Sequence, residues 1–326
     1  MIILKKQPNK DFIILNLTDP QLGASEWEEG HVNRKILEHT VAQLIERVKP
    51  DLITITGDLA WAGQDYAYQM FGKLMESFQI PWAIIWGNHD NQNGPEFVNK
   101  MTDEYLKLPH FLFEKGDPTL GIGNYVIGIE ENNKIIQALI MMDTHHQEPY
   151  VNSAGEERMV WSKLTKAQIA WYQDTCKALK AQGCDKSVLM VHIPIYAYET
   201  ASQAAYKTDI IKTELNVAQA DGIDCWNEKY QNSIGVQHEG IACYPEDDGM
   251  FDAILTESIT QYVIAGHDHV NNFIICYEGV NLIYALKTGA GCYWEPALNG
   301  GTVLKVNSNG VYDFAHAYVD ISQFLD

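Results

Sequence analysis

The chain has 326 residues, of which 46% are hydrophobic and 20% are charged, and this globular composition excludes a disordered chain. Lys and Arg number 23 against 43 Asp and Glu, so the formal net charge is −20. This acidity disfavours nucleic acid and anionic membranes as partners, because clustered Lys and Arg bind both. No apolar run reaches the ~18 residues that cross a bilayer.

The N-terminus and the cysteines predict a cytoplasmic protein. The apolar run Met1–Leu4 is too short for a signal peptide, and its basic residues follow it instead of preceding it. If a disulfide did form, Cys225 with Cys243 is the first pair to examine. All six cysteines lie in the second half without a Cys-x-x-Cys pair, which is typical of reduced thiols: Cys176, Cys184, Cys225, Cys243, Cys276 and Cys292.

Five short apolar runs share one pattern, because each ends abruptly in polar residues that can bind metal. Near-continuous apolar runs of this length predict strands that are buried on both faces. The runs are Phe12–Leu17, Leu52–Thr56, Trp82–Trp86, Val188–Val191 and Tyr262–Ala265.

Strands and helices alternate in the first part of the chain. The stretches His31–Val48 and Tyr66–Phe78 have helical spacing of apolar residues, and Pro50 and Pro81 follow them. Such alternation indicates parallel βαβ units. In parallel sheets, sites form beyond the carboxyl ends of the strands. All five polar clusters fall at such ends.

Later segments predict three hairpins, one helix and one long excursion. The helix is Thr165–Leu179, with Thr165 as its cap. Residues 196–249 show weak periodicity, and long insertions of this kind are usually functional loops. We expect one domain over residues 1–326. The hairpins pair Tyr125–Ile129 with Ile135–Met142, Phe273–Tyr277 with Val280–Leu286, and Thr302–Val306 with Val311–His316.

The polar residues at the strand ends form a candidate dinuclear metal site. Such a site needs about seven O or N ligands and one bridging carboxylate. Each element alone also has an ordinary reading, such as a tight turn or a core histidine, but the ordered combination favours metal. His89 could face a substrate instead of an ion. The set is Asp19, Gln21, Asp58, Asn88, His192, His267 and His269.

This order of motifs resembles the calcineurin-like metallophosphoesterase superfamily. The motifs are Asp19-x-Gln21, Gly57-Asp58, Gly87-Asn88-His89-Asp90, Val191-His192 and Gly266-His267-x-His269. Further motifs are similar to the intracellular purple-acid-phosphatase-like branch, namely Met142-Asp143-Thr144, Gln168-x-x-Trp171, His192-Ile-Pro194 and Gly249-Met-Phe251. Two positions depart from the pattern. Gln21 replaces a common His, and Trp61 stands where purple phosphatases have an iron-binding Tyr, which argues against a purple Fe(III) centre.

The resemblance implies the fold and the metal sites. The fold would be α/β, a four-layer αββα sandwich of two mixed sheets flanked by helices, with the insertion 196–249 at the substrate mouth. Asp19, Gln21, Asp58 and His269 would hold one divalent ion. Asp58, Asn88, His192 and His267 would hold the other, with Asp58 bridging. Mn, Fe or Zn suits these ligands, and the neutral amide of Gln21 favours Mn.

The same resemblance assigns further roles. His89 would protonate the leaving oxygen, while Asp90 would either assist it or hold the turn. Asp268 could orient a ligand histidine. The aromatic residues among the candidates for the substrate pocket could instead pack in the core. The pocket candidates are Asn88, His145, His146, His238, Tyr293 and Trp294.

The function that follows is metal-dependent hydrolysis of a small phosphomonoester. Phosphodiesterase activity on cyclic nucleotides or other small diesters is the alternative, since both reactions use the same dimetal attack. A non-catalytic scaffold with this fold is an alternative of another class, although His89 is present. No nucleic-acid or membrane partner is expected, and the oligomeric state stays open.

Overall fold

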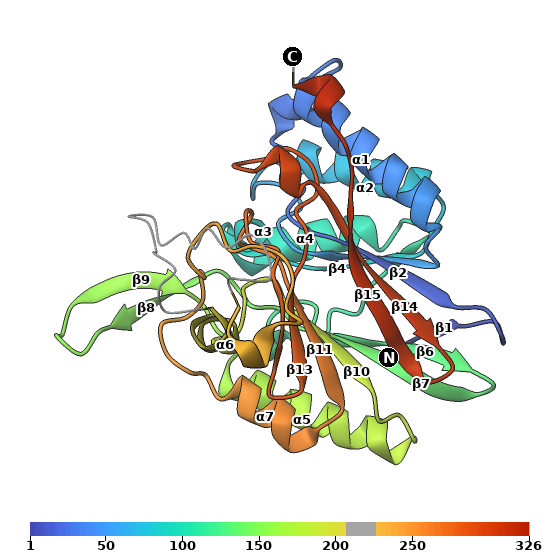
Figure 1. Ribbon diagram of the computed structural model, residues 1–326. Coiled ribbons are helices and arrows are strands. Elements are labelled where there is room, and N and C mark those ends of the chain that lie inside the picture. The colour runs from blue at the N-terminus through green and yellow to red at the C-terminus, as the bar shows by residue number, and fades with distance from the viewer. Residues whose placement is uncertain (207–225, 326) are drawn as a thin grey trace.

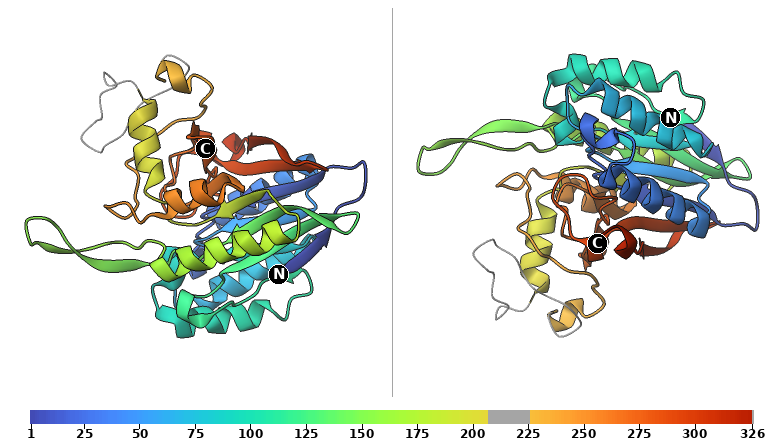
Figure 2. Two further views of the ribbon diagram at one scale, coloured as in Figure 1. Left: turned by 90° about the horizontal axis from the view of Figure 1, so that it is seen from below. Right: turned by 90° about the horizontal axis from the view of Figure 1, so that it is seen from above.

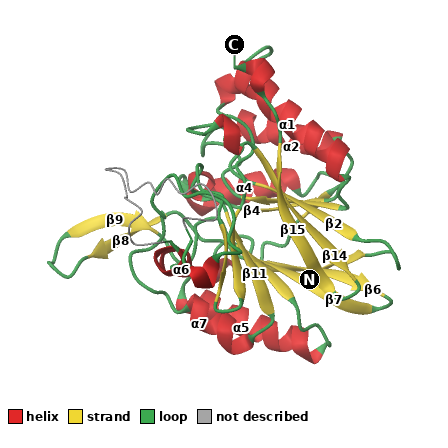
Figure 3. Cartoon of the chain, in the orientation of Figure 1, coloured by secondary structure: helices red, strands yellow, loops and turns green. Residues whose placement is uncertain are grey.

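Two mixed sheets stack between helices in the computed structural model, which describes residues 1–206 and 226–325 (Figure 1). The seven-stranded sheet and the six-stranded sheet share one apolar core, and their outer faces are covered by helices (Figure 3). This arrangement confirms the predicted α/β sandwich. None of the described helices is long and apolar enough to cross a membrane.

The six-stranded sheet contains the first three predicted strands. β2, β3 and β4 are parallel neighbours, so their polar carboxyl ends meet at one edge. β14 and β15 form the predicted antiparallel hairpin beside β2. The order is β15 (Gly310–Tyr318), β14 (Gly300–Asn307), β2 (Phe12–Leu17), β3 (Leu52–Thr56), β4 (Trp82–Ile85) and β5 (Phe111–Leu112).

The seven-stranded sheet contains the other two predicted strands. β7, β10, β11 and β13 run parallel, while β6 with β7 and β12 with β13 form the two other predicted hairpins. The order is β1 (Ile2–Lys5), β6 (Tyr125–Glu131), β7 (Lys134–Met141), β10 (Ser187–Met190), β11 (Thr260–Ala265), β13 (Val280–Tyr284) and β12 (Ile274–Tyr277).

The helices bury apolar stripes against the two sheets. Ile36, Val41 and Leu44 of α1 pack on the six-stranded sheet, and Cys176 and Leu179 of α5 pack on the other. The predicted cap of α5 is confirmed, since Thr165 Oγ1 accepts from Gln168 N at 3.2 Å. The helices are α1 (Val32–Val48), α2 (Asp65–Ser77), α3 (Asn88–Asn91), α4 (Gly94–Tyr105), α5 (Lys166–Ala181), α6 (Ala197–Ala205) and α7 (Met250–Glu257).

A two-stranded arm, β8 (Gln147–Val151) and β9 (Glu157–Trp161), is absent from the sequence prediction. It projects from the body in both views of Figure 2. The side chains of Val151 and Met159 point into solvent there, at 57% and 56% exposure, so no amphipathic alternation marked these strands.

Part of the long excursion lies among the described residues. α6 and a short 3-10 helix at Glu228–Tyr230 lie within it, and isolated bridges tie Ile234 to Ile274 at the start of β12 and Gln237 to Asn271 just before it. Residues 207–225 lie outside the described part, and so does Cys225 of the suggested disulfide. The five described cysteines are free thiols. The single-domain assignment stays a prediction.

Gln137 links the two sheets, and its substitution is expected to destabilise the fold. Its fully buried Oε1 accepts from Val311 N at 3.0 Å, which joins β7 to β15. Gln137→Met keeps the volume but leaves that N–H unpaired, at a cost of about 1–3 kcal/mol. Urea unfolding would measure the change. The matched control Gln69→Met, on the exposed side of α2, should stay within about 0.5 kcal/mol. Equal losses of stability in the two variants would contradict the role of Gln137 in linking the sheets.

Candidate metal centre

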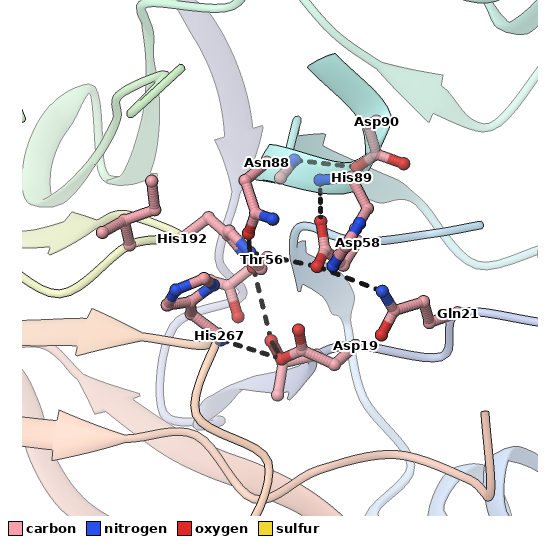
Figure 4. A network of polar contacts seen from close by, with 12 residues as sticks. Asp19, Gln21, Thr56, Asp58, Asn88, His89, Asp90, His192 and His267 are labelled. Carbon is pink, nitrogen blue, oxygen red and sulfur yellow. Dashed lines mark hydrogen bonds and ion pairs between the residues drawn. The ribbon is translucent and has the colours of Figure 1, made fainter. Parts of the chain in front are cut away.

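All seven predicted ligands lie together where the carboxyl ends of the two sheets meet. Each is buried, and His267 is the most exposed at 7%. Figure 4 shows six of them pointing toward one another from β2, β3, β4, β10 and β11 or the turns after them. Asp58, His192 and His267 form one compact group of potential ligand atoms. Asp19, Asp58 and His269 form another such group, so that Asp58 belongs to both.

Four of these side chains sit on strained backbone. Asp19, Gln21, Asp58 and His267 have φ values of 53°, 44°, 52° and 77°, in the left-handed region that non-glycine residues seldom occupy. Such residues cost about 1–3 kcal/mol each and persist where the surroundings hold them. Here the sharp turn after each strand aims the side chain back toward the neighbouring strands.

Gly87 allows the turn after β4 to approach the turn after β3, which carries Asp58. A Cβ at Gly87 would lie 2.1 Å from Asp58 Oδ1, which is impossible without movement. The missing side chain lets His89 N donate to that same oxygen at 2.8 Å. The glycine before Asn88 is therefore required by the close contact with Asp58, in addition to any turn preference.

His192 shows why the group of Asp58, His192 and His267 fits a cation. Its Nδ1 lies 2.7 Å from the carbonyl of Thr56, so that nitrogen holds a proton and donates it. Its Nε2 then faces Asn88 Oδ1 at 2.8 Å and Asp58 Oδ2 at 3.3 Å, and both are acceptors. A second proton or a cation has to lie among these three atoms.

His269 repeats this arrangement in the group of Asp19, Asp58 and His269. Its Nδ1 lies 2.7 Å from the carbonyl of Tyr293, and its Nε2 lies 3.4 Å from Asp19 Oδ1. Thr18 Oγ1 and His267 N donate to the other oxygen of Asp19, at 2.6 and 3.1 Å. The carboxylate is thus held by one oxygen while the other is aimed at the histidine.

Several buried ligand atoms make no hydrogen bond within the described residues. They are Asp19 Oδ1, Gln21 Oε1 and His267 Nε2, and the amide nitrogen of Asn88, a donor, also makes no hydrogen bond. Buried polar atoms are normally paired, so a cluster of unpaired ones is unusual. Oxygen and imidazole nitrogen without thiolate are the donors that Mn, Fe and Zn accept. The residues present therefore fit two divalent cations that share Asp58.

The electrostatics of the site also favour bound positive charge. Burial would raise the pKa of Asp58 and of Asp19, but His192 and His269 respectively hold each pKa below its usual range. Burial would lower the pKa of His192, yet Asp58 raises it to about 10. The carboxylates thus strongly attract a proton to His192, and the same field attracts a cation.

His89 lies beside this centre on α3. Gln92 Nε2 lies 2.7 Å from His89 Nδ1, and the ring meets the edge of Trp61 with centroids 4.4 Å apart. An amide NH₂ can only donate, so Nδ1 accepts and the proton of a neutral His89 sits on Nε2. Trp61 offers no ligand atom of the kind that a purple iron centre needs.

Two further acidic residues are held by the fold. Asp90 accepts from Gly87 N at 2.8 Å, Leu59 N at 3.1 Å and the Tyr68 hydroxyl at 2.7 Å, which favours the turn-holding interpretation. Asp268 accepts from Tyr284 and from Ala242 N. Backbone carbonyls, and not Asp268, take the Nδ1 protons of His192 and His269.

The predicted pocket residues divide into two groups. The ring of Tyr293 stacks on His269 at 4.2 Å, and His146 lies near His89 and Asn88 with its Nδ1 buried and unpaired. Asn88 is one of the candidate ligands described above, and the remaining three contact the scaffold. His145 Nε2 lies 3.0 Å from Gln168 Oε1, His238 Nδ1 lies 2.7 Å from Glu295, and Trp294 packs against the apolar core.

Sequence reasoning missed three residues at the site. Trp161, at the base of the arm, packs edge-on against His267 with centroids 4.6 Å apart. Gln92 contacts His89, one helical turn away in the sequence. Lys287 donates to the backbone carbonyl of Asp19 at 2.6 Å. A lysine directly after a buried strand was a usable signal, whereas nothing in the sequence connected Trp161 with His267.

Asp90→Asn is expected to destabilise the chain, because both carboxylate oxygens accept hydrogen bonds. The amide would place an NH₂ against a backbone or hydroxyl donor, at a cost of about 1–3 kcal/mol. Urea unfolding of chelator-treated protein would measure it. Asp174→Asn, at an exposed ion pair with Lys177 on α5, is the control. Wild-type stability combined with a large loss of turnover would instead indicate a chemical role for Asp90.

Comparison with known proteins gives relatives of low identity. The chain is 26% identical over 278 residues to "Probable inactive purple acid phosphatase 29" of Arabidopsis thaliana, covering 78% of this chain and 64% of that protein. It is 23% identical over 338 residues to "Phosphatase DCR2" of Saccharomyces cerevisiae, covering 95% of this chain and 54% of that protein. The chain therefore spans less than two thirds of the length of these curated relatives.

The fold and the sequence profile agree. A dimetal phosphatase from Danio rerio has a similar structure, with a TM-score of 0.56 at 12% identity over 94% of this chain and 98% of that one, which is a likeness of fold. The profile of calcineurin-like phosphoesterases matches residues 12–271, a span that contains all seven candidate ligands. The chain belongs to the calcineurin-like phosphoesterase family.

Proposed function

We propose that the chain is a metal-dependent phosphoric ester hydrolase that acts on small phosphomonoesters. The observation that carries this proposal is the pair of buried ligand groups that share Asp58, with the imidazole of His89 beside them. A purely structural core would pair buried polar atoms with one another, and it would not leave the potential ligand atoms Asp19 Oδ1, Gln21 Oε1 and His267 Nε2 without a hydrogen bond.

Each cation has a defined set of residues in this proposal. Asp19, Gln21, Asp58 and His269 hold the first ion, and Asp58, Asn88, His192 and His267 hold the second. When bound, two divalent ions activate water and neutralise charge on the phosphoryl oxygens. Mn is favoured, because Gln21 contributes a neutral oxygen where relatives commonly use imidazole. Asp19 and Asp58 cancel only part of the cationic charge, which favours an anionic ligand.

His89 is the proposed proton donor to the leaving oxygen. Its backbone N–H is fixed by Asp58, and Gln92 and Trp61 orient the ring with the proton on Nε2. Asn88, His146 and Tyr293 are the proposed substrate contacts. His145, His238 and Trp294 remain weaker candidates, because each already contacts the scaffold.

Catalysis itself needs a direct test, since the name of one relative calls that protein inactive. A non-catalytic scaffold would lack turnover even with both ions bound. The cytoplasmic location and the small phosphate ester as partner stay predictions. Matched assays of para-nitrophenyl phosphate and its bis ester with added Mn separate monoesterase, diesterase and scaffold.

Asp58→Asn should abolish tight binding of both ions together with hydrolysis, because one carboxylate serves both groups. Metal content after gel filtration and turnover of para-nitrophenyl phosphate would be measured in parallel. The control is Asp174→Asn, which removes an exposed carboxylate far from the site in sequence and should change neither quantity. A variant at Asp58 that keeps two ions and full turnover would disprove the bridging assignment.

His89→Asn should keep both ions and lose activity in a way that depends on the leaving group. General acid catalysis contributes about 10²–10⁴ in rate, and poor leaving groups need it most. Alkyl phosphates should therefore lose far more turnover than para-nitrophenyl phosphate. Equal losses across a series of leaving groups would rule out the acid role.

A further inference from the structure

A buried lysine contacts the first ligand group, which consists of Asp19, Gln21, Asp58 and His269. Lys287 is 3% exposed, and its Nζ donates to the backbone carbonyl of Asp19 at 2.6 Å. Among the residues that the structure describes, no carboxylate oxygen lies within 4 Å of this ammonium. Buried lysines are normally paired, as Lys6 is with Glu131 at 2.7 Å. Lys287 thus places an unusual positive charge next to residues that are proposed to bind cations.

The backbone fixes Lys287 in this place. Thr288 N donates to the carbonyl of Thr18 at 3.0 Å, and Thr18 N donates back to Thr288 Oγ1 at 3.3 Å. Further along, a Cβ at Gly291 would lie 2.3 Å from the carbonyl oxygen of Pro20. The segment after β13 therefore lies against the turn that carries Asp19 and Gln21, which places Lys287 beside this turn.

The position of Lys287 is unequal with respect to the two groups. Its Nζ contacts Asp19, which belongs only to the first group, and within the described residues it makes no hydrogen bond to Asp58, Asn88, His192 or His267. The contact is with an uncharged carbonyl oxygen, so no ion pair in the described part of the chain neutralises the ammonium.

We propose that Lys287 is a fixed positive charge that weakens divalent-ion binding at the first site (Asp19, Gln21, Asp58, His269), so that the second site (Asp58, Asn88, His192, His267) fills first. This inference rests on the proposed function, since it assumes that both groups bind ions. Coulomb repulsion supplies the cause, because an ion at the first site would be held by Asp19, whose backbone carbonyl Lys287 contacts. The neutral ligand Gln21 adds to the asymmetry.

A merely structural role makes the opposite prediction. If Lys287 served only to hold the carbonyl of Asp19, its removal would loosen the turn and weaken ion binding. If its charge opposes the first ion, its removal strengthens binding there. The direction of the change in affinity therefore separates the two roles.

The test is calorimetric titration of chelator-treated full-length protein with MnCl₂. Wild type should bind two ions with unequal affinity. Lys287→Met should tighten the weaker step by about tenfold or more, the order expected for removing one charge near a divalent ion in a partly screened site. Lys287→Arg should resemble wild type. Lys6→Met, which removes a buried lysine that pairs with Glu131 at the end of β6, should alter stability without changing either affinity.

The outcomes separate the two proposals. Wild type that binds no Mn would overturn the proposed function. If wild type binds two ions but Lys287→Met does not bind the weaker ion more tightly, only the proposed role of Lys287 would be overturned. If the variant does not fold, wild-type crystals with one equivalent of Mn decide by anomalous scattering. The ion should lie between His192 and His267, and an ion beside Asp19 and His269 would refute the order of filling.

Discussion

The site depends on histidine nitrogens that are forced to face oxygen acceptors. In both groups the Nδ1 proton is bound to a main-chain carbonyl, of Thr56 or of Tyr293, so the ring cannot rotate or change tautomer without losing that bond. The opposite nitrogen is then aimed at a carboxylate or amide oxygen. These nitrogen and oxygen atoms are kept together by the two sheets, by the turns after five strands and by the segment that follows β13.

Side chains can converge in this way only because the backbone comes unusually close. Asp58 is reached by the turn at Gly87, and the turn at Asp19 is pressed by the segment after β13. Both contacts cross between elements that are distant in sequence. The ligands are thus positioned by main-chain hydrogen bonds on rigid strand ends, while the outer aromatic rings of Trp61, Trp161 and Tyr293 pack against three of the imidazoles.

The sequence predicted the elements in which burial or ligand residues leave a pattern among neighbouring residues. The buried strands β2, β3 and β4 read as continuous apolar runs, and the polar residues after them fell at a common edge, as expected for parallel neighbours. The arm of β8 and β9 could not be found, because Val151 and Met159 are exposed where a strand pattern would bury them. The partners of Asp90 and Lys287 were equally hidden, since Tyr68 and Asp19 reach them only through the fold.

The strained turns have a consequence for how long the folded chain survives. Asp19, Gln21, Asp58 and His267 together hold unfavourable backbone and crowded acceptors in one place, and the rest of the core has to offset this. A ligand that binds only the native state stabilises it by about 2.7 kcal/mol at a hundred times its dissociation constant. On the proposed function, the cations are therefore part of the fold's thermodynamic balance. The fraction of unfolded chain open to proteases would rise as the available metal falls, which couples abundance to metal supply.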